Sequence, residues 1–347
     1  MAVSRCSGIP AKVMTGPAEQ EKMLKETNVS LLSLVVPFLN ERDTVQQFAA
    51  FGAKLKAEIK QRHQLDLEIV LVDDGSRDDS IERYSAALQG DWRIVELSRN
   101  FGKEIALFAG IEESRGDYVM MVDADLQHPY DVCLEMIDAL MADPQLDVVY
   151  TIRDDRRDES MRKAVLGEMF YWLINARQRF NIPPNAGDFR IMRRSAVDAL
   201  LKVRDKRRFN KGLYAWLGFR QKAIHYIPDE RVAGATKWSK LALLTLSLEG
   251  ITSFTAIPLR LASIFGLLVG LGGIIYGLHI IVTALLYGAD VPGYPSLMSA
   301  ITVLGGFNLA LLGLLGEYIW VAVGEVKDRP LYLVRRLHHS DKKENNG

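Results

Sequence analysis

The chain has few cysteines, no excess of either charge and no apolar run near its start. Cys6 and Cys133 are the only cysteines among 347 residues, and neither belongs to a Cys-x-x-Cys or Cys/His grouping. A disulfide framework and a structural zinc site are therefore disfavoured. Forty-three Lys and Arg balance forty-three Asp and Glu, which removes any global case for nucleic-acid binding. Residues 1–28 lack a signal-peptide core and are interpreted as a flexible tail.

Short apolar runs rich in Val and Ile alternate with amphipathic stretches from Leu31 onward. This alternation is typical of βαβ units, and it predicts an α/β domain over residues 29–235. The predicted strands are 31–37, 67–72, 93–97, 118–122 and 147–151. The predicted helices, which have apolar residues at three- and four-residue spacing, are 45–60, 81–88, 104–114 and 132–141.

The last third of the chain contains two long stretches without a charged side chain, 261–286 and 297–316. Each is long enough to cross a bilayer as a helix. We predict a transmembrane hairpin over 261–321, with spans at about 261–286 and 297–318, followed by a basic tail at 322–347. The positive-inside rule then puts both termini and the α/β domain in the cytoplasm. A pair of buried core helices is the alternative interpretation of these runs.

Residues 236–260 connect the two parts and carry apolar side chains at helical spacing, among them Leu241, Leu244 and Leu248. That pattern predicts an amphipathic helix in the membrane interface. Residues 201–240 hold eleven Lys or Arg against three acids. A solvated face is the usual explanation of such a run, but beside two membrane spans attraction to anionic headgroups is favoured.

Polar turns follow the predicted strands. They are Asn40-Glu41, Asp73-Asp74-Gly75-Ser76, the segment 99–103 and Asp123-Ala124-Asp125. Because ligands of open α/β sheets bind at the carboxyl ends of the strands, we expect these turns to converge in one acidic pocket. Asp73 and Asp74 are suited to accept hydrogen bonds from a nucleobase and ribose. The alternative is a tight turn with a helix cap, in which Ser76 and Asp78 bond free amide groups.

Asp123 and Asp125 lie two residues apart just beyond a buried strand, so one turn can aim both carboxylates at the same point. Hard oxygen ligands of this kind suit Mg²⁺ or Mn²⁺, which also binds substrate phosphates. A divalent ion would make an acidic pocket attractive to a diphosphate and stabilise that group as it departs. An isolated Asp-x-Asp more often caps a helix or stays solvated, but its place after a strand favours the metal.

Four of these motifs occur in the order found in glycosyltransferase family 2, which the chain resembles over roughly residues 30–335. They are the segments 35–41, 72–76, 98–104 and 123–127. Within that family, the segments 187–190, 231 with 236–238, and the apolar runs with 316–319 resemble the polyprenyl-phosphate sugar transferases, which include bactoprenol glucosyltransferases and dolichyl-phosphate mannose synthases. The resemblance implies a GT-A type, Rossmann-like nucleotide-sugar domain and hexosyltransferase activity. The Q-x-x-R-W signature of processive synthases is absent.

The resemblance also assigns roles by position. The donor-binding residues would be Pro37, Leu39, Asn40, Glu41, Val72, Asp73, Asp74, Lys103, Asp123 and Ala124. The metal ligands would be Asp123, Asp125 and Gln127, and the catalytic residues Asp125 and Asp188. The residues that grip the acceptor phosphate would be Arg153, Arg162, Arg231 and Lys237. Leu39 stands where many relatives have tyrosine, and Asp188 could act as a base or pair with Arg190. The six histidines are interpreted as structural.

The sequence thus predicts an inverting transferase that moves a sugar from a nucleotide-sugar donor, UDP-glucose, to undecaprenyl phosphate. It would be a multi-pass homo-oligomer of the bacterial cytoplasmic membrane with Mg²⁺ or Mn²⁺ as cofactor. Two alternatives stay open. One is transfer to a hydroxyl acceptor in surface glycan or glycolipid synthesis, and the other is a catalytically silent membrane scaffold. The acids at positions 123, 125 and 188 disfavour the scaffold, because a silent scaffold has no reason to keep acids in a crevice, where they are costly.

Overall fold

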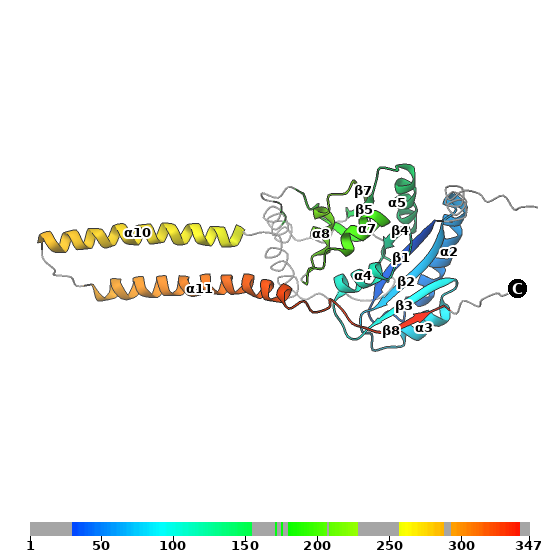
Figure 1. The fold of residues 1–347 in the computed structure, drawn as a ribbon, viewed down its shortest axis with the longest axis horizontal. Coiled ribbons are helices and arrows are strands. Elements are labelled where there is room, and N and C mark those ends of the chain that lie inside the picture. The colour runs from blue at the N-terminus through cyan, green and yellow to red at the C-terminus, as the bar shows by residue number, and fades with distance from the viewer. Residues whose placement is uncertain are drawn as a thin grey trace, which may run out of the picture.

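The computed structural model describes residues 30–154, 171, 175, 180–206, 208–227, 257–287 and 293–340. In this part of the chain, an α/β domain built on one sheet lies at one end of the molecule, and a pair of long helices extends away from it (Figure 1). The predicted tail 1–28 and most of the predicted interfacial helix 236–260 lie outside the described residues.

The described residues form an eight-stranded sheet with the order β7-β5-β6-β4-β1-β2-β3-β8. The strands are β1 (Leu31–Phe38), β2 (Asp66–Asp73), β3 (Asp91–Leu97), β4 (Tyr118–Met121), β5 (Val148–Arg153), β6 (Ala186–Arg193), β7 (Gln221–Tyr226) and β8 (Val334–His339). The first five agree with the predicted strands to within two residues at either end.

The centre of the sheet is parallel, whereas its flanks are mixed: β6 and β8 run antiparallel to their neighbours, and β7 runs parallel to β5. β4, β1, β2 and β3 are neighbours that run in one direction, as βαβ units require. β6 lies antiparallel between β4 and β5, so β5 runs in the same direction as β4. The common direction expected for the five predicted strands is therefore present, but the antiparallel β6 inserted between β4 and β5 was not predicted. An apolar pattern reports the burial of a strand and not its direction.

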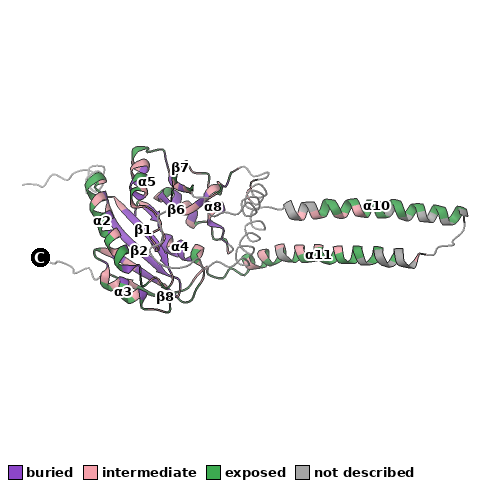
Figure 2. Cartoon of the chain, turned by 180° about the vertical axis from the view of Figure 1, so that it is seen from behind, coloured by how far each residue is buried: buried purple, intermediate pink, exposed green. Residues whose placement is uncertain are grey.

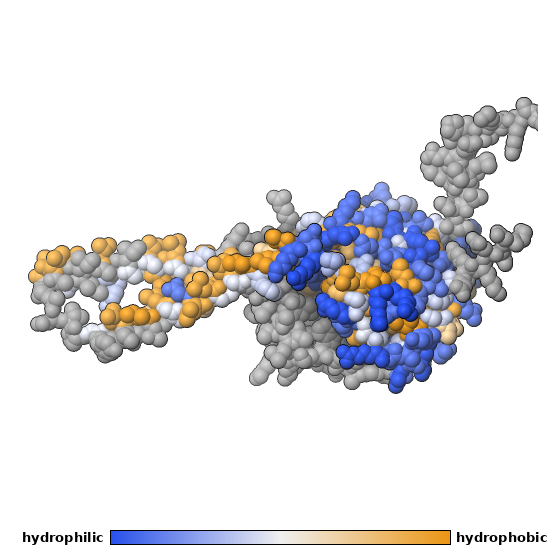
Figure 3. Space-filling model, turned by 60° about the horizontal axis from the view of Figure 1, so that its bottom comes forward, coloured by the Kyte–Doolittle hydropathy of each residue, from blue (hydrophilic) through white to orange (hydrophobic). Residues whose placement is uncertain are grey.

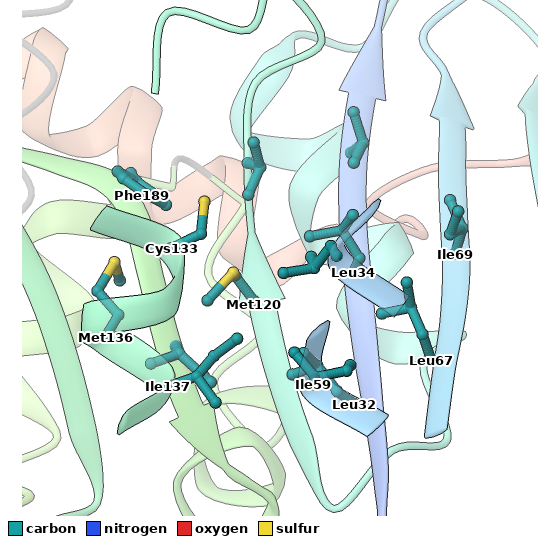
Figure 4. Packing of buried hydrophobic residues seen from close by; sticks show 14 of the residues in the cluster. Leu32, Leu34, Ile59, Leu67, Ile69, Met120, Cys133, Met136, Ile137 and Phe189 are labelled. Carbon is teal, nitrogen blue, oxygen red and sulfur yellow. The ribbon is translucent and has the colours of Figure 1, made fainter. Parts of the chain in front are cut away.

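Helices cover both faces of the sheet. On one face lie α2 (Val45–His63), α3 (Ser80–Ala87) and α5 (Tyr130–Ala142), and on the other α4 (Lys103–Glu112), α7 (Arg194–Leu201) and α8 (Asn210–Trp216). Side chains of a strand alternate between the faces. Leu34 of β1 belongs to the first core and Val35 to the second. Figure 4 shows the first core, in which Cys133 and Ile137 of α5 lie beside Met120 of β4.

The two long helices are α10 (Ile257–Tyr287) and α11 (Tyr294–Val326), each about 45 to 50 Å long at 1.5 Å per residue. They lie side by side, and the ring centroids of Phe265 and Phe307 are 4.7 Å apart. Among the described residues, one helical segment, Val303–Val326, is long and apolar enough to cross a membrane, while Ala262–Gly273 is a shorter apolar helix. The span predicted at 261–286 is not confirmed.

The chain returns from α11 to the sheet through residues 327–340, here called the C-terminal strap. β8 in this strap pairs antiparallel with β3, although the sequence had assigned the region to a basic tail. The hydroxyl of Tyr332 donates to Glu112 of α4 over 2.7 Å. Just before the strap, Glu325 accepts a hydrogen bond from the backbone N–H of Lys206 over 2.8 Å. The hairpin is therefore fastened to the α/β domain at separate points.

Candidate active site

The loops after β2 and β3 are held together by a buried carboxylate. Asp74 accepts hydrogen bonds from the backbone N–H groups of Phe101 (2.7 Å) and Gly102 (3.0 Å). Burial raises the pKa of Asp74, because water no longer solvates its charged form. Gly102 has φ of 99°, a conformation that favours glycine, and α4 begins at the next residue. Asp74 thus fixes the loop that presents Lys103.

The loop after β1 is hydrogen-bonded to the loop after β2. Asp73 is buried and accepts a hydrogen bond from the N–H of Ser76 over 3.0 Å, while the Ser76 hydroxyl accepts one from the N–H of Asn40 over 2.8 Å. Gly75 has φ of 82°, and a Cβ there would lie 2.7 Å from the backbone nitrogen of Asn100. The paired acids therefore organise three loops, and their contact with a nucleoside stays a prediction.

The remaining predicted donor residues line the ends of the same strands. Pro37 and Val72 are buried, Leu39 and Glu41 are half-buried, and Asn40 is exposed. The hydrogen bonds of the turn after β2 agree only in part with the helix cap considered for Ser76 and Asp78. Asp78 accepts a hydrogen bond from the N–H of Ser80, the first residue of α3, whereas Ser76 serves the preceding loop.

Lys103 and Asp123 form the central ion pair of the site. The Nζ of Lys103 lies 2.6 Å from Oδ1 of Asp123, and Nε2 of His128 lies 3.5 Å from Oδ2. Burial alone would raise the pKa of Asp123, but the charge of Lys103 and the contact with His128 hold it well below its usual range. Burial would likewise lower the pKa of Lys103, and the carboxylates of Asp123 and Asp188 raise it instead. Both groups are charged at neutral pH.

Asp125 and Gln127 complete the turn after β4. Oδ1 of Asp125 accepts a hydrogen bond from the N–H of Gln127 over 3.2 Å, while Leu126 between them has φ of 54° and Ala124 is buried. The described residues contain no group of three His, Cys, Asp or Glu side chains that could hold a metal by themselves. Mg²⁺ binds proteins through one or two carboxylates together with substrate phosphates. The oxygen donors here therefore fit a metal shared with a diphosphate.

Asp188 reaches the same place from β6. The antiparallel register pairs Met121, the last residue of β4, with Arg190, and the negative charge of Asp188 two residues away on β6 helps to raise the pKa of Lys103. One carboxylate oxygen of Asp188 is buried and has no hydrogen-bond partner among the described residues. Arg190 forms no ion pair with it. Its guanidinium instead donates to the carbonyl of Gly187 (2.7 Å) and lies 3.4 Å from the ring centroid of Tyr214.

The predicted acceptor residues are only partly described. Arg153 ends β5, is exposed, and lies at the same edge as the ends of β1, β2 and β4, because β5 runs in their direction. Arg162, Arg231 and Lys237 lie outside the described residues.

Sequence reasoning missed two residues at this site. His128 is not only a core residue: it stacks on Phe189 with centroids 4.1 Å apart and contacts Asp123. Glu104 follows Lys103, and its carboxylate accepts a hydrogen bond from the backbone N–H of Asn210. Glu104 is the last residue of the motif 98–104 and His128 directly follows the motif 123–127, which was the available signal. Their partners come from β6 and α8, which the sequence analysis did not predict.

Comparison with known families matches both parts of the chain. The model described as Glycosyl transferase family 2 matches residues 33–201, and the model described as GtrB C-terminal hairpin matches residues 257–320. The chain is 40% identical over 308 residues to an uncharacterized glycosyltransferase of Synechocystis, which covers 88% of this chain and 95% of that one. It is 38% identical over 312 residues to the SfII prophage-derived bactoprenol glucosyl transferase of Shigella flexneri, with 89% and 99% covered.

Among solved structures, glucosyl-3-phosphoglycerate synthase from Mycobacterium tuberculosis, in complex with Mn²⁺, uridine diphosphate and phosphoglyceric acid, is 20% identical, with a TM-score of 0.40 over 64% of this chain and 76% of that one. A likeness at that level does not place ligands in the present site. The family match and the full-length relatives are sufficient: the chain belongs to glycosyltransferase family 2, with a GT-A type catalytic domain followed by a GtrB-type C-terminal hairpin.

Proposed function

We propose that this enzyme transfers a sugar, with inversion, from UDP-glucose to undecaprenyl phosphate at the cytoplasmic face of a bacterial membrane. The single observation that carries the proposal is the extent of the likeness to bactoprenol glucosyl transferases. It spans 89% of this chain and 99% of the Shigella flexneri relative, so it includes both the nucleotide-sugar domain and the apolar hairpin. An acidic site at the strand ends and an apolar helix pair in one chain suit a polar donor and a lipid acceptor.

A phosphate acceptor changes what the site must do. It is ionised near neutral pH, so no strong base has to remove a proton from it. The site has to bring that anion to the anomeric carbon and hold it there. We assign this to Arg153 at the end of β5, with Arg162, Arg231 and Lys237. Asp188, whose buried oxygen has no hydrogen-bond partner among the described residues, faces the sugar in this proposal.

We assign Mg²⁺ or Mn²⁺ to Asp123, Asp125 and Gln127. When bound, the ion supplies positive charge to the departing diphosphate. The ammonium of Lys103, which lies 2.6 Å from Asp123, adds positive charge at the same place. The turn Asp125–Gln127 holds its own geometry through the 3.2 Å hydrogen bond across it. Asp125 and Asp188 are the proposed catalytic residues.

The proposed membrane topology has two spans, with the α/β domain and both termini in the cytoplasm. Val303–Val326 supports one span, and the length of α10 supports the other. The proposed organisation is a tail at 1–28, the catalytic domain at 29–235, an interfacial helix at 236–260, the hairpin at 261–321 and a basic C-terminal region at 322–347. The homo-oligomer expected from the sequence stays a prediction.

A donor and acceptor panel tests the proposal. Purified full-length protein is offered labelled UDP- and GDP-sugars with Mg²⁺ or Mn²⁺ and, in separate reactions, undecaprenyl phosphate or a sugar or diacylglycerol hydroxyl acceptor. We expect label from UDP-glucose in the lipid phase. Label in a sugar or diacylglycerol hydroxyl acceptor but not in polyprenyl phosphate would replace this proposal with the hydroxyl-acceptor alternative. No transfer with any pair would favour the silent scaffold.

A charge variant tests the acceptor role. Arg231→Ala should raise the apparent KM for undecaprenyl phosphate about 10- to 150-fold, since a charge-assisted hydrogen bond is worth roughly 1.5 to 3 kcal/mol. The KM for UDP-glucose should change little. Lys206 would be an unsuitable control, because it contacts Asp328 and Glu325 at the end of the hairpin. Lys222→Ala, at an exposed position of β7, is the better match, and equal effects of the two variants would refute the phosphate-gripping role.

A further inference from the structure

Two hydrogen bonds, both donated by Asn210 and both accepted by Glu104, join the first turns of α4 and α8; the two residues are 106 positions apart in the chain. The backbone N–H of Asn210 donates to Oε2 of Glu104 over 2.7 Å, and its side-chain amide donates to the Glu104 carbonyl over 3.2 Å. Asn210 is buried, and its own side-chain oxygen accepts a hydrogen bond from Arg208 over 3.1 Å. We call the Glu104–Asn210 contact the α4–α8 bridge.

The bridge stands between two charged parts of the active site. On the α4 side, the residue beside Glu104 is Lys103, whose ammonium pairs with Asp123. On the α8 side, Tyr214 lies one turn after Asn210, and its ring supports the buried guanidinium of Arg190 at 3.4 Å. Arg190 belongs to the same β6 segment as Asp188. The bridge therefore connects the helix that carries Lys103 to the helix that supports the β6 side of the site.

The carboxylate of Glu104 is held against an electrostatic cost. Burial and the negative charge of Asp188 on β6 raise its pKa to about 7, while the Asn210 N–H and the charges of Lys211 and Arg208 act in the opposite direction. A neutral glutamine could accept the same hydrogen bond without that cost. A costly charge beside a catalytic site is more typical of a functional group than of a packing contact.

We propose that Glu104 and Asn210 are positioning residues for sugar transfer, and that their bridge sets the separation between the Lys103–Asp123 pair and the Asp188–Arg190 side of the site. This inference rests on the proposed function. Neither residue has to touch the substrate in this role. Misplacement of reacting groups by about 1 Å can cost on the order of 100-fold in rate, so a bridge of two hydrogen bonds is sufficient to matter.

The test uses the full-length protein in the lipid-transfer assay, with Glu104→Gln, Glu104→Ala, Asn210→Ala and the double alanine variant. We expect Glu104→Ala and Asn210→Ala each to lower kcat about 10- to 100-fold, with the KM for both substrates within about threefold. The double variant should be no slower than the worse single one, because both remove the same bridge. Glu104→Gln, which keeps an acceptor oxygen, should recover most of kcat.

The melting temperature of Glu104→Gln separates a positioning role from a merely structural one. A residue that only stabilises the fold would lower the melting temperature when it is changed. At pH 8 Glu104→Gln should raise the apparent melting temperature by about 2 to 6 °C, since it removes a buried charge. Glu112→Gln on the same helix is the matched control. It weakens contacts with Arg204 and Tyr332, so it should lower the melting temperature and leave kcat within about twofold.

The outcomes separate the two proposals. Wild-type kcat in both Glu104→Ala and Asn210→Ala would overturn the positioning role. So would a loss of kcat in Glu104→Gln that is accompanied by a fall in melting temperature. Absence of transfer by the wild-type protein with every donor would instead overturn the proposed function.

Discussion

The α/β domain and the helical hairpin use similar apolar residues and expose them oppositely. Leu71 in the centre of the sheet is 0% exposed, whereas Leu309 of α11 is 71% exposed. Figure 2 shows this contrast between the buried strands and the exposed hairpin, and Figure 3 shows apolar residues along the hairpin beside a domain surface that mixes hydrophilic and apolar patches. In water, apolar surface is stable when it is buried inside the protein, whereas in lipid it is stable when it is exposed. The comparison teaches that the domain buries its apolar residues within itself, whereas the hairpin exposes them, as the proposed membrane location requires.

The two regions also divide the chemistry between them. The polar side chains of the site stand where the apolar strands of the domain end, as Asp74 and Asp123 do. The described part of the hairpin carries the apolar surface, and the C-terminal strap fastens it to the domain through β8 and Tyr332. The strap thus joins the domain that carries the candidate site to the hairpin that carries the exposed apolar surface.

The largest expected effect comes from placing the same charge in both regions. Leu71→Arg should prevent the domain from folding, since an unpaired buried charge costs many kcal/mol. Leu309→Arg should leave the domain folded and reduce membrane association by on the order of 100-fold, from about 2.5 to 3.5 kcal/mol per charge at a span centre. Protease resistance and membrane flotation measure the two outcomes. Equal loss of folding in both variants would mean that the hairpin surface is covered by protein.

The second prediction concerns the strand-end chemistry. Asp125→Asn should lower transfer by about 100-fold or more while leaving the protein folded and in the membrane, because it removes charge without changing volume. Transfer assays, a melting curve and flotation measure the three properties. Full activity of this variant, or activity undiminished by a chelator, would exclude the metal-bridged diphosphate.

The third prediction uses pH, since the titrating groups lie in the domain. Glu104 has a folded pKa of about 7, above its ordinary value of 4.5, so the folded state binds the extra proton between these values. Stability should therefore fall as pH rises from about 4.5 to 7, by roughly 2 kcal/mol after allowance for partial exposure. Burial raises the pKa of Asp73 and Asp74, which act in the same direction.

Melting curves of the detergent-solubilised chain between pH 5 and 8 test this slope, with Glu104→Gln as the control that should flatten it. Membrane association should stay constant over the same range. A melting temperature that rises steadily with pH would show that groups with lowered pKa values, such as Glu68, dominate instead.

The smallest effect is expected at the junction of the two regions. Tyr332→Phe keeps the ring and removes the hydroxyl that donates to Glu112 over 2.7 Å. The loss should cost about 1 kcal/mol and lower the melting temperature by about 2 to 4 °C, with kcat within about twofold. A tenfold loss of lipid transfer without loss of stability would show that the strap also sets the distance from the site to the membrane.

The central elements of the fold could be predicted from local pattern. β1 to β5 and the helices between them have clear apolar periodicity, and β1, β2 and β4 are followed at once by the motif residues. β6 and β8 could not be predicted in the same way. In β6, Asp188 and Arg190 interrupt the apolar residues, and β8 contains Arg335 and Arg336, so its pattern resembles a solvated tail.

By itself, the sequence determined the βαβ order of the first half, the acids at positions 73, 74, 123 and 125, and the apolar composition of the hairpin, because each depends on residues near one another in the chain. The tertiary structure decided that Asp74 holds the loop of Lys103, that Asp188 lies near enough to Lys103 to raise its pKa, and that Glu104 bridges to Asn210. These contacts depend on which strands become neighbours and in which direction. That outcome is set by the packing of the whole sheet, and no local pattern contains it.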